Sequence, residues 1–78
     1  MKVETYNGWT NYPTWRVALE FFDGFDCDGW EYSAWDLESM VAENLAGEAQ
    51  GTALAYALAF INQVNWFEIA EHLKEEAA

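Results

Sequence analysis

The fold of this chain is decided first by residues 11–19, which read Asn11-Tyr12-Pro13-Thr14-Trp15-Arg16-Val17-Ala18-Leu19. Asn11 can cap the free backbone N–H groups at the start of a helix. Pro13 suits the first helical turn, because the N–H that proline lacks has no partner there. The stretch therefore predicts a helix over about residues 12–23, which Gly24 is suited to terminate.

Several aromatic residues recur at the spacing of a helix face. In the first helix, Trp15, Leu19 and Phe22 lie on one side, and this stripe should face the core. Aromatic residues at helical spacing are usually buried. We therefore assign four of them to the core: Trp15, Phe22, Phe60 and Trp66. Tyr6 and Trp9 should pack the N-terminal segment back onto the helices.

An acidic loop separates this helix from the next one. Residues 24–32 hold glycines and aspartates that favour turns over regular secondary structure. Ser33 followed by Asp36 has the spacing of a capping box and predicts a second helix, which Gly47 should end. The inward residues of this helix are Leu37, Val41 and Leu45. Its acidic outward face consists of Asp36, Glu38 and Glu43.

Two more helices complete the predicted fold. The apolar stretch 52–64 predicts a helix that should be the central one, because it is the most apolar of the four. Asn65 and Glu68 have a second capping-box spacing and start a last helix. Its inward residues are Trp66, Ile69, Ala70 and Leu73. Residues 1–78 should therefore form one all-α domain, a small bundle of about four helices with an acidic loop between helices one and two.

The composition allows such a small chain to fold. Of the 78 residues, 53% are hydrophobic and 18% are aromatic, and aromatic side chains bury much area per residue. Cys27 is the only cysteine, so no disulfide can form within the chain, and we expect the protein in the cytoplasm. We expect neither export nor membrane anchoring, because the longest apolar run, residues 53–61, is too short to cross a bilayer.

Charge is distributed very unevenly along the chain. Residues 17–73 contain no lysine or arginine but hold eleven of the fourteen carboxylates, and the formal net charge is -11. Such a charge repels nucleic acid and anionic membranes and attracts basic surfaces. We therefore expect no direct binding to nucleic acid or to membranes. Solubility alone requires a smaller net charge, since small soluble domains usually carry a net charge of roughly 2 to 8 in magnitude.

Residue types needed for catalysis or metal binding are scarce. His72 is the sole histidine and Cys27 the sole thiol, which rules out clusters of histidine and cysteine and leaves a nucleophile triad very hard to build. Residues 23–31 contain the D-x-D-G core of a calcium loop, but the register that aligns Gly29 with the turn glycine leaves both end positions without carboxylates. We expect no enzymatic activity, no cofactor and no metal.

The acids that follow the first helix are the predicted contact surface. They flank Trp30 and Tyr32, which either anchor a partner or cover the protein's own core, and the sequence leaves both possibilities open. Acids on helix faces are usually solvated, and we assign Glu68 and Glu71 to that class. The predicted partner-binding set is Asp23, Asp26, Asp28, Glu31, Asp36, Glu38, Glu43, Trp30 and Tyr32.

Two motifs carry a resemblance to a known family. The first, Trp9-Thr10-Asn11-Tyr12-Pro13-Thr14-Trp15-Arg16-Val17-Ala18-Leu19, resembles the W-T-N-Y-x-T-W-x-V-x-L signature of small phage and plasmid proteins. The second, Val64-Asn65-Trp66-Phe67-Glu68-Ile69-Ala70-Glu71-His72-Leu73, is similar to the closing helix of that family. With its size and charge, the chain resembles phage-encoded anti-CRISPR proteins, most closely inhibitors of the type I-C effector complex. The resemblance implies binding to effector surfaces that otherwise receive target DNA.

Charge and resemblance together predict an inhibitor that acts by binding. Carboxylates on a loop and a helix face would imitate the phosphate array of DNA, and the inhibitor would cover a basic DNA-receiving surface of a type I effector in the bacterial host cytoplasm. We expect it to be a monomer, because its net charge opposes self-association. Two alternatives stay open: an antirestriction protein or other inhibitor of a host DNA-binding protein, and a structural or oligomeric phage protein.

Overall fold

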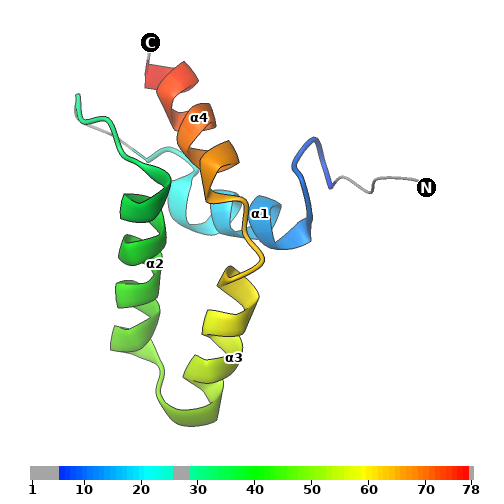
Figure 1. The fold of residues 1–78 in the computed structure, drawn as a ribbon, viewed down its shortest axis with the longest axis vertical. Coiled ribbons are helices and arrows are strands. Elements are labelled where there is room, and N and C mark those ends of the chain that lie inside the picture. Colours follow the sequence, from blue (N-terminus) through cyan, green and yellow to red (C-terminus); the bar gives the residue numbers. More distant parts are fainter. Residues whose placement is uncertain (1–5, 26–28, 78) are drawn as a thin grey trace.

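Four helices, in chain order, build the part of the protein that the computed structural model describes, residues 6–25 and 29–77, with side chains up to residue 75. They are α1 (Tyr12–Val17), which continues into the π-helical turn η1 (Ala18–Phe22), then α2 (Ala34–Glu48), α3 (Gly51–Ile61) and α4 (Trp66–Ala77). Figure 1 shows their arrangement. Within the described residues, the one extended pairing is a bridge between Tyr6 and Trp9. The predicted all-α fold is therefore confirmed.

α1 begins at the predicted cap. The Asn11 side-chain oxygen accepts hydrogen bonds from the Thr14 backbone N–H at 3.0 Å and from the Thr14 hydroxyl at 2.6 Å. Pro13 lies in the first turn, where its missing N–H needs no partner. The start of this helix, predicted from residues 11–13, is confirmed.

The second half of the first helix differs from the prediction. It does not stay α-helical to Asp23, because residues 18–22 form a π-helical turn, in which hydrogen bonds join residues five apart. This wider turn brings Val17 and Phe22 to the same side, and both are buried. The prediction that Leu19 faces the core was wrong. Its side chain is 48% exposed, because Thr14, Val17 and Ala18 face the core and Leu19 is turned about half a turn from Val17.

α2 has the capping box that the sequence predicts. The Ser33 hydroxyl accepts a hydrogen bond from the Asp36 backbone N–H at 3.1 Å, and the Asp36 carboxylate accepts one from the Ser33 backbone N–H at 3.0 Å. Leu37 and Val41 are buried. Gly47 does not end the helix, which runs one residue further to Glu48.

α2 and α3 run antiparallel and form a hairpin that projects from the rest of the molecule (Figure 1). At the open end of the hairpin, α1 contacts α3 and α4 contacts α2. The molecule measures 39 × 39 × 18 Å, and its radius of gyration is 13.0 Å, whereas a compact chain of this length has about 11.5 Å. Within the described residues, α3 packs against α2 and α1, and Thr52, Ala55, Tyr56 and Ala59 on its other side are exposed.

The hydrophobic core forms mainly from α1, η1, α2 and α4. Its buried residues are Val17, Ala18, Phe22, Leu37, Val41, Ile61, Val64, Trp66, Ile69 and Leu73. α3 contributes only Ile61 to this core, while Leu58 is 40% and Phe60 37% exposed. The prediction that the most apolar helix is the central one was therefore wrong, because the composition of a helix does not determine how many other elements pack against it.

The other aromatic predictions have mixed outcomes. Phe22 and Trp66 are buried as predicted, but Trp15 is only half-buried. The Trp9 ring packs 4.9 Å from the His72 ring on α4, measured between ring centroids. Tyr6 packs at the same separation from Trp15. The N-terminal segment thus folds back onto the helices, as predicted.

The start of α4 is tied to the start of α1 by a hydrogen-bond network, which we call the cap network, of Thr10, Asn11, Thr14, Asn65 and Glu68. Asn65 caps α4, because its side-chain oxygen accepts from the Glu68 N–H at 3.1 Å. Its own backbone N–H donates to the Thr14 hydroxyl at 2.8 Å. The Glu68 carboxylate accepts from the Thr10 N–H at 3.0 Å. The predicted second capping box is therefore only half correct, since Glu68 binds the N-terminal segment instead.

The cap network predicts the effect of Thr14→Val. Thr14 is fully buried, and valine keeps its shape but leaves the Asn65 N–H without an acceptor. We expect the free energy of unfolding to fall by about 1–3 kcal/mol, measured by urea denaturation with circular dichroism. Thr52→Val, the same replacement at an exposed position of α3, should cost less than about 0.5 kcal/mol. Equal effects at the two sites would contradict the network.

The unequal burial of α2 and α3 predicts the outcome of two alanine substitutions. Leu37 has 0% exposure, so Leu37→Ala should lower the free energy of unfolding by about 2–5 kcal/mol. Leu58→Ala should lower it by only about 1 kcal/mol, because less apolar area returns to water. The same denaturation experiment compares them. A loss at Leu58 as large as that at Leu37 would place α3 in the core after all.

Candidate functional site

Seven acidic residues were predicted to form the contact surface, and the structure describes five of them. Asp26 and Asp28 lie outside the described residues. The five are placed by the end of η1 for Asp23, by the loop before α2 for Glu31, and by α2 for Asp36, Glu38 and Glu43. The Glu31 side chain is 78% exposed. Four of the five acids thus lie within the short stretch 31–43, whereas Asp23 belongs to the end of the first helix.

α2 carries its three acids on two different sides. With 3.6 residues per turn, positions seven apart share a side and positions two apart are turned by about 200°. Asp36 and Glu43 therefore share one side, but Glu38 points to the other and is half-buried. The predicted acidic face of α2 therefore spreads over two sides of the helix, with Asp36 and Glu43 on one side and Glu38, which is as half-buried as Asp36, on the other.

Asp36 has a structural as well as an electrostatic role. Its carboxylate accepts the Ser33 N–H at the positive end of the α2 dipole, where a negative charge stabilises the helix. The same carboxylate remains half-exposed, so it still contributes to the negative surface. A substitution at Asp36 would therefore change both the helix start and the surface charge.

The two candidate aromatic anchors have different environments. Trp30 is 71% exposed. Tyr32 is half-buried, and its ring packs 5.6 Å from Phe25 against the core. Trp30 is therefore available to a partner, whereas Tyr32 covers the protein's own core.

Trp35 is an exposed residue that the sequence reasoning missed. It is 72% exposed in the first turn of α2. Helical spacing could have revealed it, because Trp35 lies two residues before the buried Leu37 and so points to the opposite side. Together with the neighbouring acids it forms a surface that we call the acidic face, made of Trp30, Glu31, Trp35, Asp36, Glu38 and Glu43.

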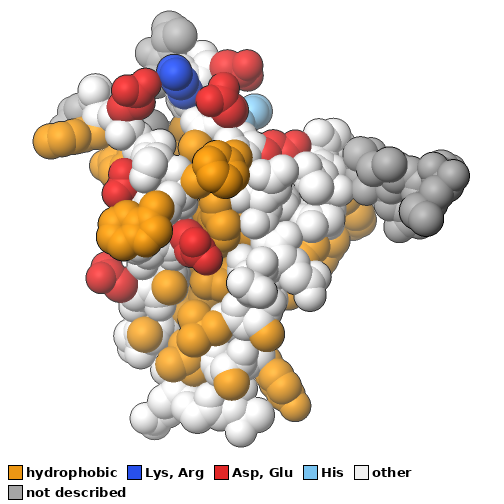
Figure 2. Space-filling model, viewed as in Figure 1, with side chains coloured by type: hydrophobic (Ala, Val, Ile, Leu, Met, Phe, Trp, Pro, Cys, Tyr) orange, Lys and Arg blue, Asp and Glu red, His pale blue; other side chains and the backbone are white. Residues whose placement is uncertain are grey.

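The surroundings of the acidic face are also rich in carboxylates. Figure 2 shows acidic side chains gathered over α4 and the first half of α2, with large hydrophobic side chains between them. Lys74 on α4 lies 3.5 Å from the Glu31 carboxylate, and both side chains are mostly exposed. Such a solvated ion pair contributes little to stability. It does link α4 to the loop that carries Trp30.

Arg16 adds little positive charge to the surface around it. Its guanidinium donates hydrogen bonds to the Glu20 carboxylate and to the Tyr12 hydroxyl. Glu20 first, and Tyr12 second, raise the pKa of Arg16 above its ordinary value. Arg16 therefore stays protonated at any physiological pH, and its charge is matched by Glu20. In the described residues both Arg16 and Lys74 pair with an acidic neighbour. Neither cation therefore cancels the negative electrostatic field of the remaining carboxylates.

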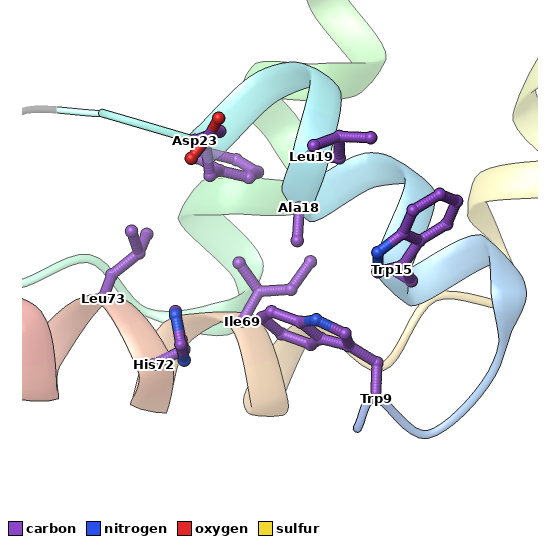
Figure 3. A pocket seen from close by; sticks show the side chains of 9 residues that line it. Trp9, Trp15, Ala18, Leu19, Asp23, Ile69, His72 and Leu73 are labelled. Carbon is purple, nitrogen blue, oxygen red and sulfur yellow. The ribbon is translucent and has the colours of Figure 1, made fainter. Parts of the chain in front are cut away.

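Asp23 lines a small pocket between η1 and α4 (Figure 3). The pocket holds about 160 Å³. Figure 3 shows Asp23 on the η1 side and His72 on the α4 side, with Trp9 and Trp15 toward the other end. The described residues that line it include no serine, threonine, cysteine or lysine. The pocket therefore does not bring a nucleophile together with a base.

The described residues offer few other sites. None of their acidic, histidine or cysteine side chains form a group of three that could hold a metal ion. The calcium-loop motif includes residues 26–28, which lie outside the described residues. No helix in the described ranges has the length and apolar character needed to cross a membrane. The acidic face is therefore the best-supported candidate site.

Comparison with known proteins assigns no relative to this chain. No protein-family model, no curated protein and no solved structure matches it. The features that bear on its function are therefore the acidic face, the charge of the chain and residues 9–19 and 64–73.

Proposed function

We propose that this protein is an anti-CRISPR inhibitor that acts as an acidic DNA mimic. It binds a basic, DNA-receiving surface of a type I effector complex, with type I-C as the first candidate, and blocks the binding of target DNA. It does so in the host cytoplasm, without catalysis and without contacting nucleic acid itself. The observation that carries the proposal is the acidic face, where exposed or half-exposed carboxylates share the loop before α2 and α2 itself with two tryptophans that are each more than 70% exposed.

The spacing of the carboxylates supports mimicry of a nucleic acid backbone. Asp36 and Glu43 are seven residues apart on α2, which corresponds to about 10 Å along the helix axis. The same distance spans about three base pairs, since each DNA strand carries a phosphate every 3.4 Å or so of axis. Lysines and arginines arranged to contact phosphates would therefore meet carboxylates at comparable positions.

The tryptophans support a protein partner. Charge alone attracts any basic surface, whereas aromatic side chains that become buried in pockets of the partner supply most of the affinity and the selectivity. Trp30 and Trp35 each offer an area of roughly 150–250 Å² for burial. Neither residue belongs to the core, so their exposure is not required for the packing of this chain.

A combined variant tests the acidic face. We expect Glu31→Lys with Asp36→Asn and Glu43→Lys to weaken inhibition about 100-fold or more, because like charges across an interface cost several kcal/mol. Asparagine at position 36 preserves a hydrogen-bond acceptor for the α2 cap. The measurement is the concentration of protein that prevents purified type I-C effector from shifting target DNA in a gel.

The matched control carries the same change in charge elsewhere. Glu20→Lys, Glu48→Gln and Glu71→Lys alter exposed acids outside the acidic face and should leave inhibition within a few-fold of the original, as judged by the same gel shift. Circular dichroism verifies that both variants fold. Full inhibition by the acidic-face variant, or equal loss in both variants, would contradict the proposed surface. An effector that shifts DNA normally at saturating protein would exclude this partner.

Salt dependence provides an independent measurement. Electrostatic contacts on a solvated surface weaken as ions screen them. We expect the affinity for the effector, measured by surface plasmon resonance, to fall steadily as salt rises from about 50 to 500 mM, a range over which the screening length drops to a few ångström. An affinity that stays flat would indicate an apolar interface and would remove the electrostatic basis of the proposal.

A further inference from the structure

α3 is the element in which composition and burial disagree most. Its sequence is Gly51-Thr52-Ala53-Leu54-Ala55-Tyr56-Ala57-Leu58-Ala59-Phe60-Ile61, yet only Ile61 is buried. Tyr56 is 75% exposed. A helix that is apolar on all sides is normally buried, and an exposed apolar patch in a soluble protein marks an interaction site. The outer side of α3 therefore requires a partner.

The exposed side of α3 forms a continuous surface with α1. We define the α3 face as Thr52, Ala55, Tyr56, Ala59 and Phe60. Tyr56 and Ala59 are turned about 140–160° from the buried Ile61, so they point away from the core. The Phe60 ring packs 6.2 Å from the Tyr12 ring, and Tyr12 in turn packs 5.1 Å from Tyr6. The apolar surface thus extends beyond the helix end.

The α3 face carries no charge. Residues 49–67 contain no aspartate, glutamate, lysine, arginine or histidine, although the chain has a net charge of -11. A basic partner gains no electrostatic attraction here and would leave its own charges without counterparts. The surface that complements this face must itself be apolar and uncharged, and a second copy of the chain presents such a surface.

We propose that two copies of this chain pair through their α3 faces in an antiparallel, two-fold arrangement. In a two-fold interface the same patch serves both subunits. Tyr56 is the middle residue of α3, so the axis passes beside it and Thr52 lies opposite Phe60 of the second copy. Ala55 and Ala59 have small side chains, which allow the two helix axes to approach to about 8 Å.

The net charge, from which we expected a monomer, does not prevent this pairing. Among the described residues, Glu20 and Asp23 lie on η1 and just after it, and the other acids lie on the loop before α2, on α2 and on α4. α2 packs against the other side of α3. A helix is about 10 Å wide, which exceeds the screening length of about 8 Å at physiological salt. Repulsion between the copies is therefore weak at the interface. It should weaken further as salt rises, so dimerisation should strengthen with salt.

The available area sets the expected affinity. An eleven-residue helix is about 16 Å long, and one such strip buries less than the roughly 800 Å² per partner of a stable complex. Tyr12 and Tyr6 enlarge the patch. The dimer should therefore be weak, with a dissociation constant in the range of about 1–100 µM.

The mass in solution tests the proposal. Light scattering coupled to size exclusion should give twice the chain mass of 8.9 kDa at high concentration, and a larger dimer fraction in high salt. Tyr56→Glu places two negative charges at the axis and should give only monomer. Trp35→Glu, at an equally exposed aromatic position on α2, should still dimerise. A monomer mass for the original chain at about 500 µM, well above the expected dissociation constant, would overturn the proposal.

Disulfide trapping tests the register independently. In a Cys27→Ser background, Tyr56→Cys should form a covalent dimer with oxidised glutathione, because the antiparallel pairing places position 56 opposite itself. Trp35→Cys in the same background should not. A dimer mass without a cross-link at position 56 would overturn the antiparallel pairing. Neither experiment contains the effector complex, so the outcome is separate from that of the inhibition assay.

Discussion

The cap network between the starts of α1 and α4 is the constraint on which the rest of the structure depends. It joins residues more than fifty positions apart in the sequence through side chains that also cap the two helices. Closing a loop of that length costs roughly 3–4 kcal/mol of chain entropy, while each neutral hydrogen bond contributes about 1 kcal/mol. The network therefore sets the geometry, and its entropic cost is offset by burial of the core, in which Leu37, Val41 and Ile69 are the most fully buried hydrophobic residues.

This constraint explains why α3 has an open side. Once α1 and α4 are joined at their starts, α2 packs against α4 and α3 connects the end of α2 back to the network. The hairpin is then held at its open end only (Figure 1). The two motifs behind the family resemblance, residues 9–19 and 64–73, supply all five residues of the cap network. These two stretches therefore hold the fold, and the proposed acidic face lies elsewhere.

Local features of this fold could be predicted from sequence, and long-range features could not. The caps at Asn11 and Ser33 follow from short-range stereochemistry, and both are present. The π-helical turn, in which Phe22 is buried on the same side as Val17, was not predicted from such local signals. The Glu68 carboxylate accepts a hydrogen bond from the Thr10 N–H, and Thr10 is too distant in sequence for a local pattern to predict this contact. The burial of α3 was overestimated because the apolar character of a helix does not show which other elements pack against it.

The candidate site shows the same division. Asp36 and Glu43 share one side of α2 for reasons of helical spacing, and the same spacing places Glu38 beside Trp35, three residues before it. The exposure of Trp30 and the covering position of Tyr32 depend on how the loop meets Phe25, which no local pattern encodes.

Charge segregation makes the two proposed interfaces compatible. The acidic face lies on the loop and on α2, while the α3 face is turned away from α2 by the width of a helix. Two copies joined through α3 would keep both acidic faces exposed at opposite ends of the dimer. A basic groove would then meet a longer negative surface than one chain provides, and the uncharged run 49–67 would separate the two fields enough to limit their mutual repulsion.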